Sequence, residues 1–330
     1  MAFSVSKKNS VWGYFEMEET PFEDAESLSA LWGRRWGVNS EYGALRAVMM
    51  HRPGGEMKTV DEACYVPETD ALIGPNREFY WFGKKTPDIA KMQAEHDYFA
   101  SVLKKHGAEV VYTKDVPTRL TKMLNTRDVA TAVPGGLVVC RTGPAMRHGE
   151  EQVATKTAAA AGVPIVKTIT GAGRMEGGGF MFLDPKHAAV ALSIRCNEEG
   201  IRQMKELLDA MDVDLTVLPC CGNYLHIDGN IGIVDDHTAL INYPALPYFF
   251  LEKLKKLGYR LIEVDQEDPW TTVNGITIKP GVVTIVEGNN KTAERLYKAG
   301  VEVIPVPWEE CAKNGGSLHC ATCPLEREYV

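Results

Sequence analysis

The stretch Lys291-Thr292-Ala293-Glu294-Arg295-Leu296-Tyr297-Lys298-Ala299-Gly300-Val301-Glu302-Val303-Ile304-Pro305-Val306 contains the pattern that decides the fold. The residues before Gly300 have the apolar spacing of an amphipathic helix, and glycine is the residue type that most often ends a helix. A β-branched run follows at once, which is typical of a buried strand. The stretch therefore predicts a helix over residues 291–299 and a strand over residues 301–306.

The same order of helix, glycine and strand recurs along the chain, roughly every 50 residues. The predicted helices are 88–106, 146–161, 198–211, 248–257 and 291–299. The predicted strands are 46–51, 109–113, 136–141, 163–168, 188–194, 214–218, 231–234, 260–264, 281–287 and 301–306. Stacked or radial modules have this repeat, but a doubly wound sheet alternates in the same way. The pattern predicts an α/β fold and leaves these two architectures open.

No low-complexity or Pro/Gly/Ser-rich linker divides the chain. We therefore expect one catalytic domain over residues 41–330. Residues 1–40, which include Trp12, Trp32 and Trp36, are expected to form an N-terminal extension that caps it. The aromatic run Phe79–Gly83 has too many rings for a solvated loop, so it is a lid over a site, a contact with another subunit, or part of the core.

Composition narrows the class of partner. The 330-residue chain has 45% hydrophobic residues and a formal net charge of −8, and no block of lysine and arginine resembles a nucleic-acid footprint. We find no secretory signal and no run of roughly 18 apolar residues that would span a membrane. Eight cysteines without regular short spacing favour reduced thiols. These features predict a cytoplasmic protein with a small, cationic substrate and leave homo-oligomerisation open.

A cysteine near the C-terminus is the strongest chemical signal. It follows a glycine turn in Gly315-Gly316-Ser317-Leu318-His319-Cys320. A thiol attacks only as thiolate, so it needs a base or a nearby positive charge. His226 is a candidate because Asp228 follows two residues later, and in an extended segment both side chains point to one face. The alternative is a surface His-x-Asp at a strand end.

Two further carboxylates stand beside structural signals. Glu176 precedes three glycines and the apolar run Phe180–Leu183, which we interpret as an inner strand. A carboxylate at the mouth of such a strand could orient a histidine, although it could equally be a turn residue. Asp128 follows Arg127 and could be a turn or cap residue. Each of these signals is weak alone.

Taken in order, Arg127-Asp128, Glu176-Gly177-Gly178, His226-Ile227-Asp228 and the glycine-rich segment ending in Cys320 resemble the guanidino-group modifying superfamily. Its members include arginine deiminases, dimethylarginine dimethylaminohydrolases and glycine amidinotransferases. The match spans residues 128–320, and Tyr42–Val48 is similar to the first strand of that family.

The resemblance implies a five-bladed α/β propeller of ββαβ units around a central site. It implies that Cys320 is the nucleophile, His226 the acid/base and Glu176 its orienting carboxylate. Asp128 and Asp228 would then grip the substrate guanidinium. Arg147 is similar to an arginine that family members use on the substrate carboxylate; the alternative is a solvated or ion-paired arginine at a helix start. The resemblance implies no metal and no cofactor.

The expected reaction is cleavage of a C–N bond at the guanidinium carbon, with release of ammonia or an amine. Two departures from the family bear on the substrate. Deiminases and dimethylarginine hydrolases commonly have Glu-Gly-Gly-Asp, whereas the fourth position here is Gly179. Amidinotransferases tend to have aspartate where this chain has Glu176. We therefore favour a hydrolase and keep an amidinotransferase as the alternative.

Two other classes compete with this interpretation. Cys320-Ala321-Thr322-Cys323 is a C-x-x-C motif of the kind found in zinc and thiol redox sites. A second cysteine pair with suitable spacing is missing, because Cys220 and Cys221 are adjacent. A catalytically inactive binding scaffold is the third class, but the thiol, the imidazole and the three carboxylates are all present.

Overall fold

We describe the protein from a computed structural model, in which residues 20–74, 78–220, 222 and 224–330 are placed. Over these residues the strands form six three-stranded sheets, and five of them belong to ββαβ units. In each unit two antiparallel strands are followed by a helix and by a third strand parallel to the second. This order explains the helix–glycine–strand repeat, because the sequence signal comes from the second half of each unit.

Four of the units are continuous in sequence, and their bounds are as follows. They consist of β6 (Ala130–Val133), β7 (Gly136–Val139), α5 (Glu150–Ala161) and β8 (Ile165–Thr168); β9 (Phe180–Asp184), β10 (His187–Leu192), α6 (Glu198–Ala210) and β11 (Asp214–Pro219); β12 (Ile231–Ile233), β13 (Thr238–Ile241), α7 (Tyr248–Lys256) and β14 (Arg260–Glu263); and β15 (Thr277–Lys279), β16 (Val282–Val286), α8 (Asn290–Lys298) and β17 (Glu302–Val306).

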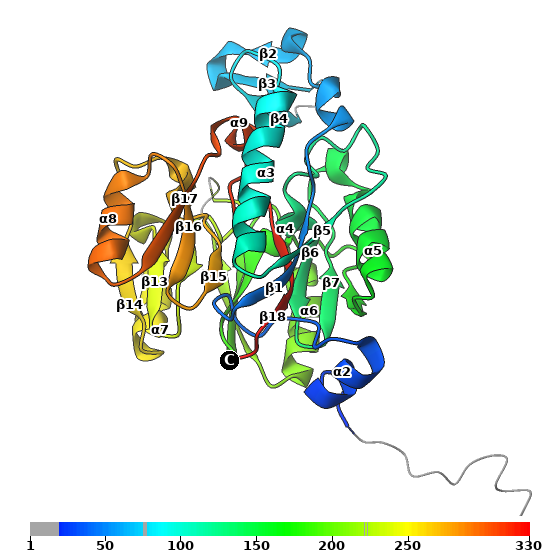
Figure 1. The fold of residues 1–330 in the computed structure, drawn as a ribbon, viewed down its shortest axis with the longest axis vertical. Coiled ribbons are helices and arrows are strands. Elements are labelled where there is room, and N and C mark those ends of the chain that lie inside the picture. Colours follow the sequence, from blue (N-terminus) through cyan, green and yellow to red (C-terminus); the bar gives the residue numbers. More distant parts are fainter. Residues whose placement is uncertain (1–19, 75–77, 221, 223) are drawn as a thin grey trace, which may run out of the picture.

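The remaining unit joins the two ends of the described chain. Strand β18 (Cys323–Arg327) pairs antiparallel with β1 (Leu45–Met50), and β1 pairs parallel with β5 (Glu109–Tyr112) after helix α3 (Ile89–Lys105). Figure 1 shows β18 beside β1 at the centre, with α3 in front and α5 and α8 on opposite flanks. The fold is therefore the five-bladed α/β propeller of ββαβ units, which confirms the predicted fold class.

The sixth sheet is an insertion between β1 and α3. It contains β2 (Tyr65–Val66), β3 (Ala71–Ile73) and β4 (Phe79–Phe82), and it lies at the top of Figure 1. The aromatic run is therefore a strand rather than the loop we expected. Trp81 is buried, and the Phe82 N–H donates to the carbonyl oxygen of Lys313 at 2.8 Å. This strand thus packs on the segment that leads to Cys320.

The predicted helices and strands agree with the structure at most boundaries, with one informative exception. Helix α5 begins at Glu150, although apolar spacing predicted a start at residue 146. Gly149 has a φ of 105°, a conformation that interrupts a helix, and Ala145–Arg147 forms a separate 3-10 turn. The short helices α2 (Ala25–Trp32), α4 (Thr126–Val129) and α9 (Glu309–Ala312) were not predicted.

Residues 36–38 pack against the core of the propeller and beside strand β18. Trp36 and Val38 are buried in the largest apolar cluster, and the Gly37 N–H donates to the carbonyl oxygen of Leu325 at 2.9 Å. Trp32, in α2, is 43% exposed, whereas Trp12 lies outside the described residues. The division of the chain at residue 40 stays a prediction.

Candidate active site

The loops that lead into the first strand of each unit meet at the centre of the molecule. Each carries one polar or nucleophilic residue two to four positions before its strand: Asp128 before β6, Glu176 before β9, Asp228 before β12, Asn274 before β15 and Cys320 before β18. Equivalent positions in repeated units lie around the same axis, so the repeat itself brings these five side chains together.

Hydrogen bonds tie neighbouring loops to one another. The Asp228 N–H donates to the carbonyl oxygen of Gly178 at 3.2 Å, and the Asn274 side-chain amide donates to that of Asp228 at 3.1 Å. The Cys320 N–H donates to Asn274 Oδ1 at 3.1 Å, and the Arg127 N–H donates to the carbonyl oxygen of Cys320 at 2.9 Å. The reactive residues are thus held on a rigid ring of backbone rather than on free loops.

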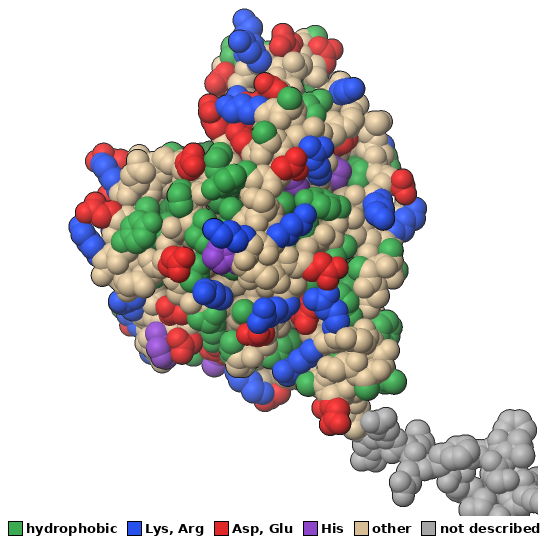
Figure 2. Space-filling model, in the orientation of Figure 1, with side chains coloured by type: hydrophobic (Ala, Val, Ile, Leu, Met, Phe, Trp, Pro, Cys, Tyr) green, Lys and Arg blue, Asp and Glu red, His purple; other side chains and the backbone are tan. Residues whose placement is uncertain are grey.

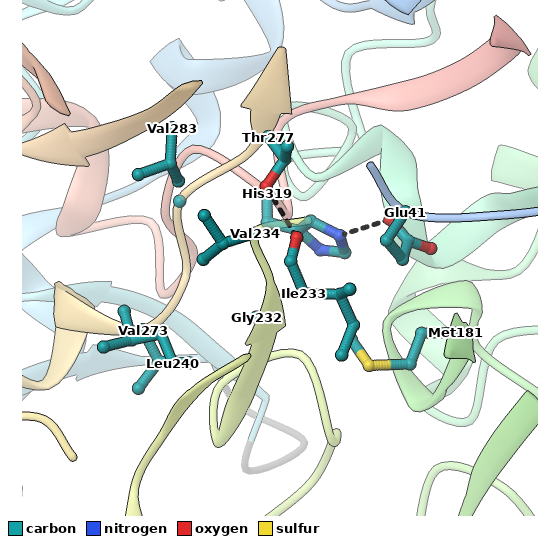
Figure 3. Close-up of a pocket in the computed structure, with 11 residues that line it drawn as sticks. Glu41, Met181, Gly232, Ile233, Val234, Leu240, Val273, Thr277, Val283 and His319 are labelled. Carbon is teal, nitrogen blue, oxygen red and sulfur yellow. Dashed lines mark hydrogen bonds and ion pairs between the residues drawn. The ribbon is translucent and has the colours of Figure 1, made fainter. Parts of the chain in front are cut away.

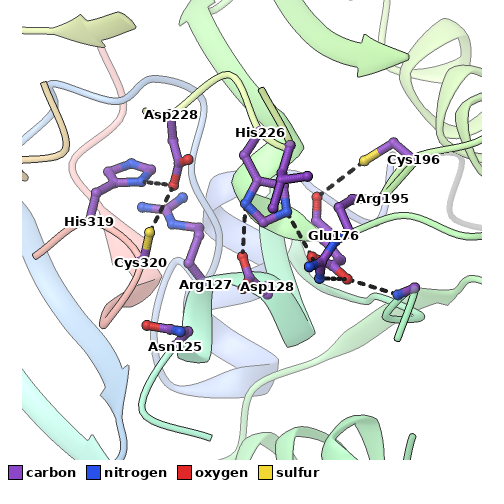
Figure 4. A network of polar contacts seen from close by, with 12 residues as sticks. Asn125, Arg127, Asp128, Glu176, Arg195, Cys196, His226, Asp228, His319 and Cys320 are labelled. Atoms are coloured by element: carbon purple, nitrogen blue, oxygen red, sulfur yellow. Dashed lines mark hydrogen bonds and ion pairs between the residues drawn. The ribbon is translucent and has the colours of Figure 1, made fainter. Parts of the chain in front are cut away.

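One side of the site contains a histidine and two carboxylates (Figure 4). His226 Nε2 lies 2.7 Å from Glu176 Oε2, and His226 Nδ1 lies 3.6 Å from Asp128 Oδ1. Glu176 is fully buried and also accepts the backbone N–H of Gly143 at 2.8 Å. Glu176 therefore fixes the ring of His226 while Asp128 faces its other nitrogen.

Charges in this half favour a protonated imidazole. Burial alone would lower the pKa of His226, but the negative charges of Asp128, Glu176 and Asp228 raise it to about 9. Burial would raise the pKa of Glu176, but the hydrogen bond and charge of His226 hold it well below its ordinary value. Near neutral pH the pair is an imidazolium beside a carboxylate, which makes His226 a proton donor before it can act as a base.

The other side of the site contains the thiol. Cys320 Sγ lies 3.7 Å from Asp228 Oδ2, and the side chain of Cys320 is 8% exposed. Burial and the charges of Asp228 and Asp128 raise the pKa of this thiol well above its ordinary value. In the free protein Cys320 is therefore protonated, and a cation placed between the two aspartates would favour the thiolate.

The two halves face each other across Gly178. A Cβ atom built on Gly178 would lie 2.9 Å from Asp128 Oδ1, 3.0 Å from His226 Nδ1 and 3.1 Å from Asp228 Oδ2. Asp128 Oδ1 is buried and has no hydrogen-bond donor among the described residues. The absence of a side chain at Gly178 thus lets the three side chains converge in front of the backbone.

The structure places Arg147 beside the site but not open to it. Its side chain is 4% exposed, and it donates to Asp128 Oδ2 at 2.6 Å and to Glu150 Oε2 at 2.8 Å. The same guanidinium reaches the carbonyl oxygens of Lys122 and Asn125. These contacts are those of the ion-paired alternative in the sequence analysis, and a contact of Arg147 with a substrate carboxylate stays a prediction.

Several site residues were not found by sequence reasoning. Arg195 lies 3.2 Å from Glu176 Oε1 and its side chain is 21% exposed, so it is the more accessible arginine of the two. Asn274 precedes its strand by the same three residues as Asp228 and Cys320, so alignment of the repeated units could have found it. His319 contacts Asp228, and Glu41 contacts His319. His319 directly precedes the cysteine in the sequence. Glu41 carried no signal.

A metal could be held by only some of these residues. Among the described residues, Asp128, Glu176 and His226 offer ligand atoms within 4.8 Å of one another. The C-x-x-C motif does not form such a group: Cys323 Sγ donates to the carbonyl oxygen of Ala130 at 3.3 Å within the core, and Cys320 and Cys323 are both free thiols. The zinc interpretation of the motif is therefore not supported by its geometry.

Comparison with known proteins agrees with this arrangement. The family model for N,N-dimethylarginine dimethylhydrolase, eukaryotic, matches residues 82–327. The chain belongs to this family. An arginine deiminase of Mycobacterium avium (strain 104) is 24% identical, and the match covers 88% of this chain and 98% of that protein.

Solved structures show the same fold. A cysteine-to-serine mutant of the dimethylarginine hydrolase of Pseudomonas aeruginosa, complexed with citrulline, superposes with a TM-score of 0.68 at 20% identity, covering 85% of this chain and 99% of that one. The inosamine-phosphate amidinotransferase of Streptomyces griseus gives a TM-score of 0.67 at 16% identity, covering 89% and 97%. The family thus includes guanidino-group hydrolases and shares its fold with amidinotransferases.

Surface features add little to this picture. On the face shown in Figure 2, acidic and basic side chains are interspersed rather than gathered by sign. Among the described residues, no helix has the length and apolar content needed to cross a membrane.

Proposed function

We propose that the protein is a cysteine-dependent hydrolase of a small guanidino compound. One observation carries the proposal: the thiol of Cys320, the His226–Glu176 pair and the carboxylates of Asp128 and Asp228 converge in front of Gly178. A guanidinium is planar and cationic, and its fork of N–H donors suits two carboxylates at a fixed orientation. The remaining question is how the protonated thiol becomes reactive.

Binding of the cation activates the nucleophile. Asp228 and Asp128 raise the pKa of Cys320 in the free protein, so a positive charge between them offsets the cause of that shift. The Cys320 proton passes to solvent, because His226 is already protonated, and the thiolate attacks the central carbon to give a tetrahedral adduct. His226, protonated at neutral pH, donates a proton to the departing nitrogen, and ammonia or an amine leaves.

The second half of the reaction uses water. After the first step Cys320 carries an S-alkylthiouronium group, and His226 has become a neutral base. It takes a proton from a water molecule, whose oxygen attacks the same carbon. Collapse of the adduct releases a urea or ureido product and returns the thiolate. Glu176 keeps the imidazole aligned throughout, because its carboxylate stays in contact with Nε2.

The alternative of an amidinotransferase differs only in the second acceptor, an amine in place of water. Glu176 in place of the aspartate typical of transferases supports water, as does membership of a hydrolase family. The reduced thiols of Cys320 and Cys323 support a cytoplasmic location.

A guanidine panel tests the proposal. The protein is incubated with arginine, N-methylated arginines, agmatine and guanidino acids, and ammonia, alkylamines, urea and ureido products are measured. Cys320→Ser should reduce turnover by about 1000-fold or more, since the nucleophile is lost. Cys64→Ser, at a half-buried cysteine outside the site, should keep wild-type turnover. Product formation only in the presence of an added amine would identify a transferase, and turnover that survives Cys320→Ser would refute the mechanism.

A further inference from the structure

Asp228 contacts a second buried histidine that the proposed reaction does not use. His319 Nδ1 lies 2.9 Å from Asp228 Oδ2, and His319 Nε2 lies 3.3 Å from Glu41 Oε2. Glu41, His319 and Asp228 are 7%, 6% and 3% exposed. Figure 4 shows His319 and Cys320 on the same side of Asp228, and Figure 3 shows His319 facing Glu41.

The contacts of the ring indicate its charge. Each nitrogen of His319 faces a carboxylate oxygen, and a neutral imidazole can donate a hydrogen bond from only one nitrogen. Both bonds form together only when the ring is doubly protonated. The backbone N–H of His319 donates to the carbonyl oxygen of Asn274. Both of these groups are neutral, so this bond adds no charge near the ring.

Solvent cannot compensate these charges. The cavity beside His319 and Glu41 has a volume of about 20 Å³, which is room for about one water molecule. Its other walls are mainly apolar, as Ile233, Val273 and Val283 illustrate in Figure 3. Buried charges with so little water are stable only when they are paired. The cation between Glu41 and Asp228 therefore stabilises both carboxylates.

The pairing extends beyond these three residues. Arg127 Nη1 lies 3.6 Å from Glu41 Oε1, and Arg327 also faces Glu41. The charges thus alternate from Arg127 through Glu41 and His319 to Asp228. The next position in the series is the space in front of Gly178, where the proposed reaction requires a substrate cation.

We propose that His319, held as an imidazolium by Glu41, is a positioning residue that keeps Asp228 ionised and aimed at the substrate cation. The inference rests on the proposed function and assigns a role to two residues outside the reacting group. Glu41 belongs to the segment before β1 and His319 to the loop before β18, so the joined ends of the chain set the charge of the clamp.

The electrostatics of the carboxylates agree with this role. Burial alone would raise the pKa of Asp228, but the hydrogen bond and charge of His319, together with the charges of His226 and Arg127, lower it. Burial would likewise raise the pKa of Glu41, but Arg127 and His319 lower it to about 2. Without the imidazolium of His319, only the charges of His226 and Arg127 oppose burial at Asp228, so the pKa of Asp228 should rise and the clamp should lose its charge at a higher pH than in the wild type.

Alkylation of Cys320 measures the clamp without knowledge of the substrate. The cationic reagent 2-chloroacetamidine needs the aspartates, whereas neutral iodoacetamide does not, so the ratio of their rate constants reports the charge of the clamp. In His319→Gln this ratio should fall by about 10-fold or more, and its acid limb should move to higher pH by about one unit. Glu41→Gln should act in the same direction and less strongly.

Two controls separate charge from structure. His319→Arg keeps a cation with donors for two carboxylates, so it should restore most of the ratio. His237→Gln, at an exposed histidine paired with Asp236, should match the wild type. Circular dichroism identifies variants that do not fold. If the wild type prefers the cationic reagent and folded His319→Gln keeps the same ratio and acid limb, the role of His319 is refuted. If the wild type shows no such preference, the proposed function itself fails.

Discussion

The two carboxylates that face the central space are held by different kinds of cation. Asp128 accepts a hydrogen bond from Arg147 at 2.6 Å, whereas Asp228 pairs with His319 at 2.9 Å. A guanidinium stays charged at every pH at which the protein is folded, but an imidazolium exists only where its surroundings maintain it. One half of the clamp is therefore a permanent anchor, and the other depends on a neighbouring carboxylate.

The two halves also differ in how many acids share one cation. Arg147 contacts Asp128 and Glu150 and lies 4.0 Å from Glu176, and all three carboxylates are nearly inaccessible. Among the residues that the structure describes, His319 forms ion pairs with Glu41 and Asp228 alone. We conclude that loss of Arg147 should affect folding first, whereas loss of His319 should affect the pH dependence of binding first.

Removal of Arg147 should have the largest effect on stability. Arg147→Met would leave Asp128 and Glu150 buried without their cation, and breaking a buried ion pair in this way costs about 3–5 kcal/mol. Urea denaturation at neutral pH would measure the change in the free energy of unfolding. Arg202→Met, which removes an exposed arginine from a helix surface, is the matched control and should change stability little.

Activity of the same variant sharpens the assignment. Because Arg147 is engaged by protein groups, any variant that folds should lose turnover equally with arginine and with agmatine, which lacks the carboxylate. A KM that rises more for arginine than for agmatine would instead show that Arg147 meets the substrate carboxylate. A stability loss no larger than that of Arg202→Met would remove its role as an anchor.

Glu150 predicts a pH dependence confined to the Asp128 half. Burial raises its pKa from 4.5 to about 7 in spite of Arg147. The unfolded chain ionises this acid at lower pH than the folded protein does, so the contribution of Glu150 to stability should fall as the pH rises from 4.5 to about 7. The change is on the order of 3 kcal/mol. Burial lowers the pKa of His96 from 6.5 to about 4, so His96 contributes in the opposite direction, and the effect of Glu150 is measured as a difference between two proteins that both contain His96. Glu41, Glu176 and Asp228 have lowered pKa values, so they change stability at pH values below this range.

Glu150→Gln isolates this contribution. The amide keeps an oxygen that can accept from Arg147 Nε but cannot ionise, so the stability of the variant relative to the wild type should rise between pH 4.5 and 7. Denaturation profiles of the two proteins across that range provide the measurement, with Glu294→Gln at an exposed helix position as control. Parallel profiles for wild type and Glu150→Gln would show that Glu150 is ionised in the folded state throughout.

Much of the fold was predictable because each unit repeats the same local signal. Helices that end at glycine and continue into β-branched strands were found from residues such as Ala299-Gly300-Val301. Some short strands were not predicted: β6, β13 and β15 have three or four residues each, and β18 begins directly after the nucleophile loop. Such strands are defined by their partners in the ring, which local sequence does not contain.

The site residues that belong to sequence motifs were predicted, whereas those outside any motif were not. Asp128, Glu176, His226, Asp228 and Cys320 lie together as the resemblance implies, although their roles remain proposals. Glu41 reaches His319 only because the two ends of the chain pair in one sheet, so nothing near it in sequence points to the site. Arg147 forms buried ion pairs with both Glu150 and Asp128. Asp128 lies in a different segment, so the sequence near Arg147 does not predict this pairing.

The smallest predicted effect concerns the two glycines that separate the halves. Gly178 faces the space between the carboxylates, whereas a Cβ on Gly179 would lie 2.5 Å from Cys196 Sγ, behind Glu176. Gly179→Ala should therefore destabilise the fold by about 1–3 kcal/mol through overpacking. In a Cys196→Ala background the nearest atoms are the β-carbons of Ala191 at 3.8 Å and of residue 196 at 3.9 Å, which are ordinary contacts, so the same substitution should cost less than about 0.5 kcal/mol.

This double-mutant cycle also explains a departure from the family pattern. The aspartate common at this position in deiminases would begin with the same Cβ, so the chain could not accept it while Cys196 occupies that space. A coupling energy near zero between positions 179 and 196 would mean that the segment moves away from the sulfur. A coupling of the predicted size would show that Cys196 excludes a side chain at position 179. The acidic residues of the site would then be Asp128, Glu176 and Asp228, without a fourth beside them.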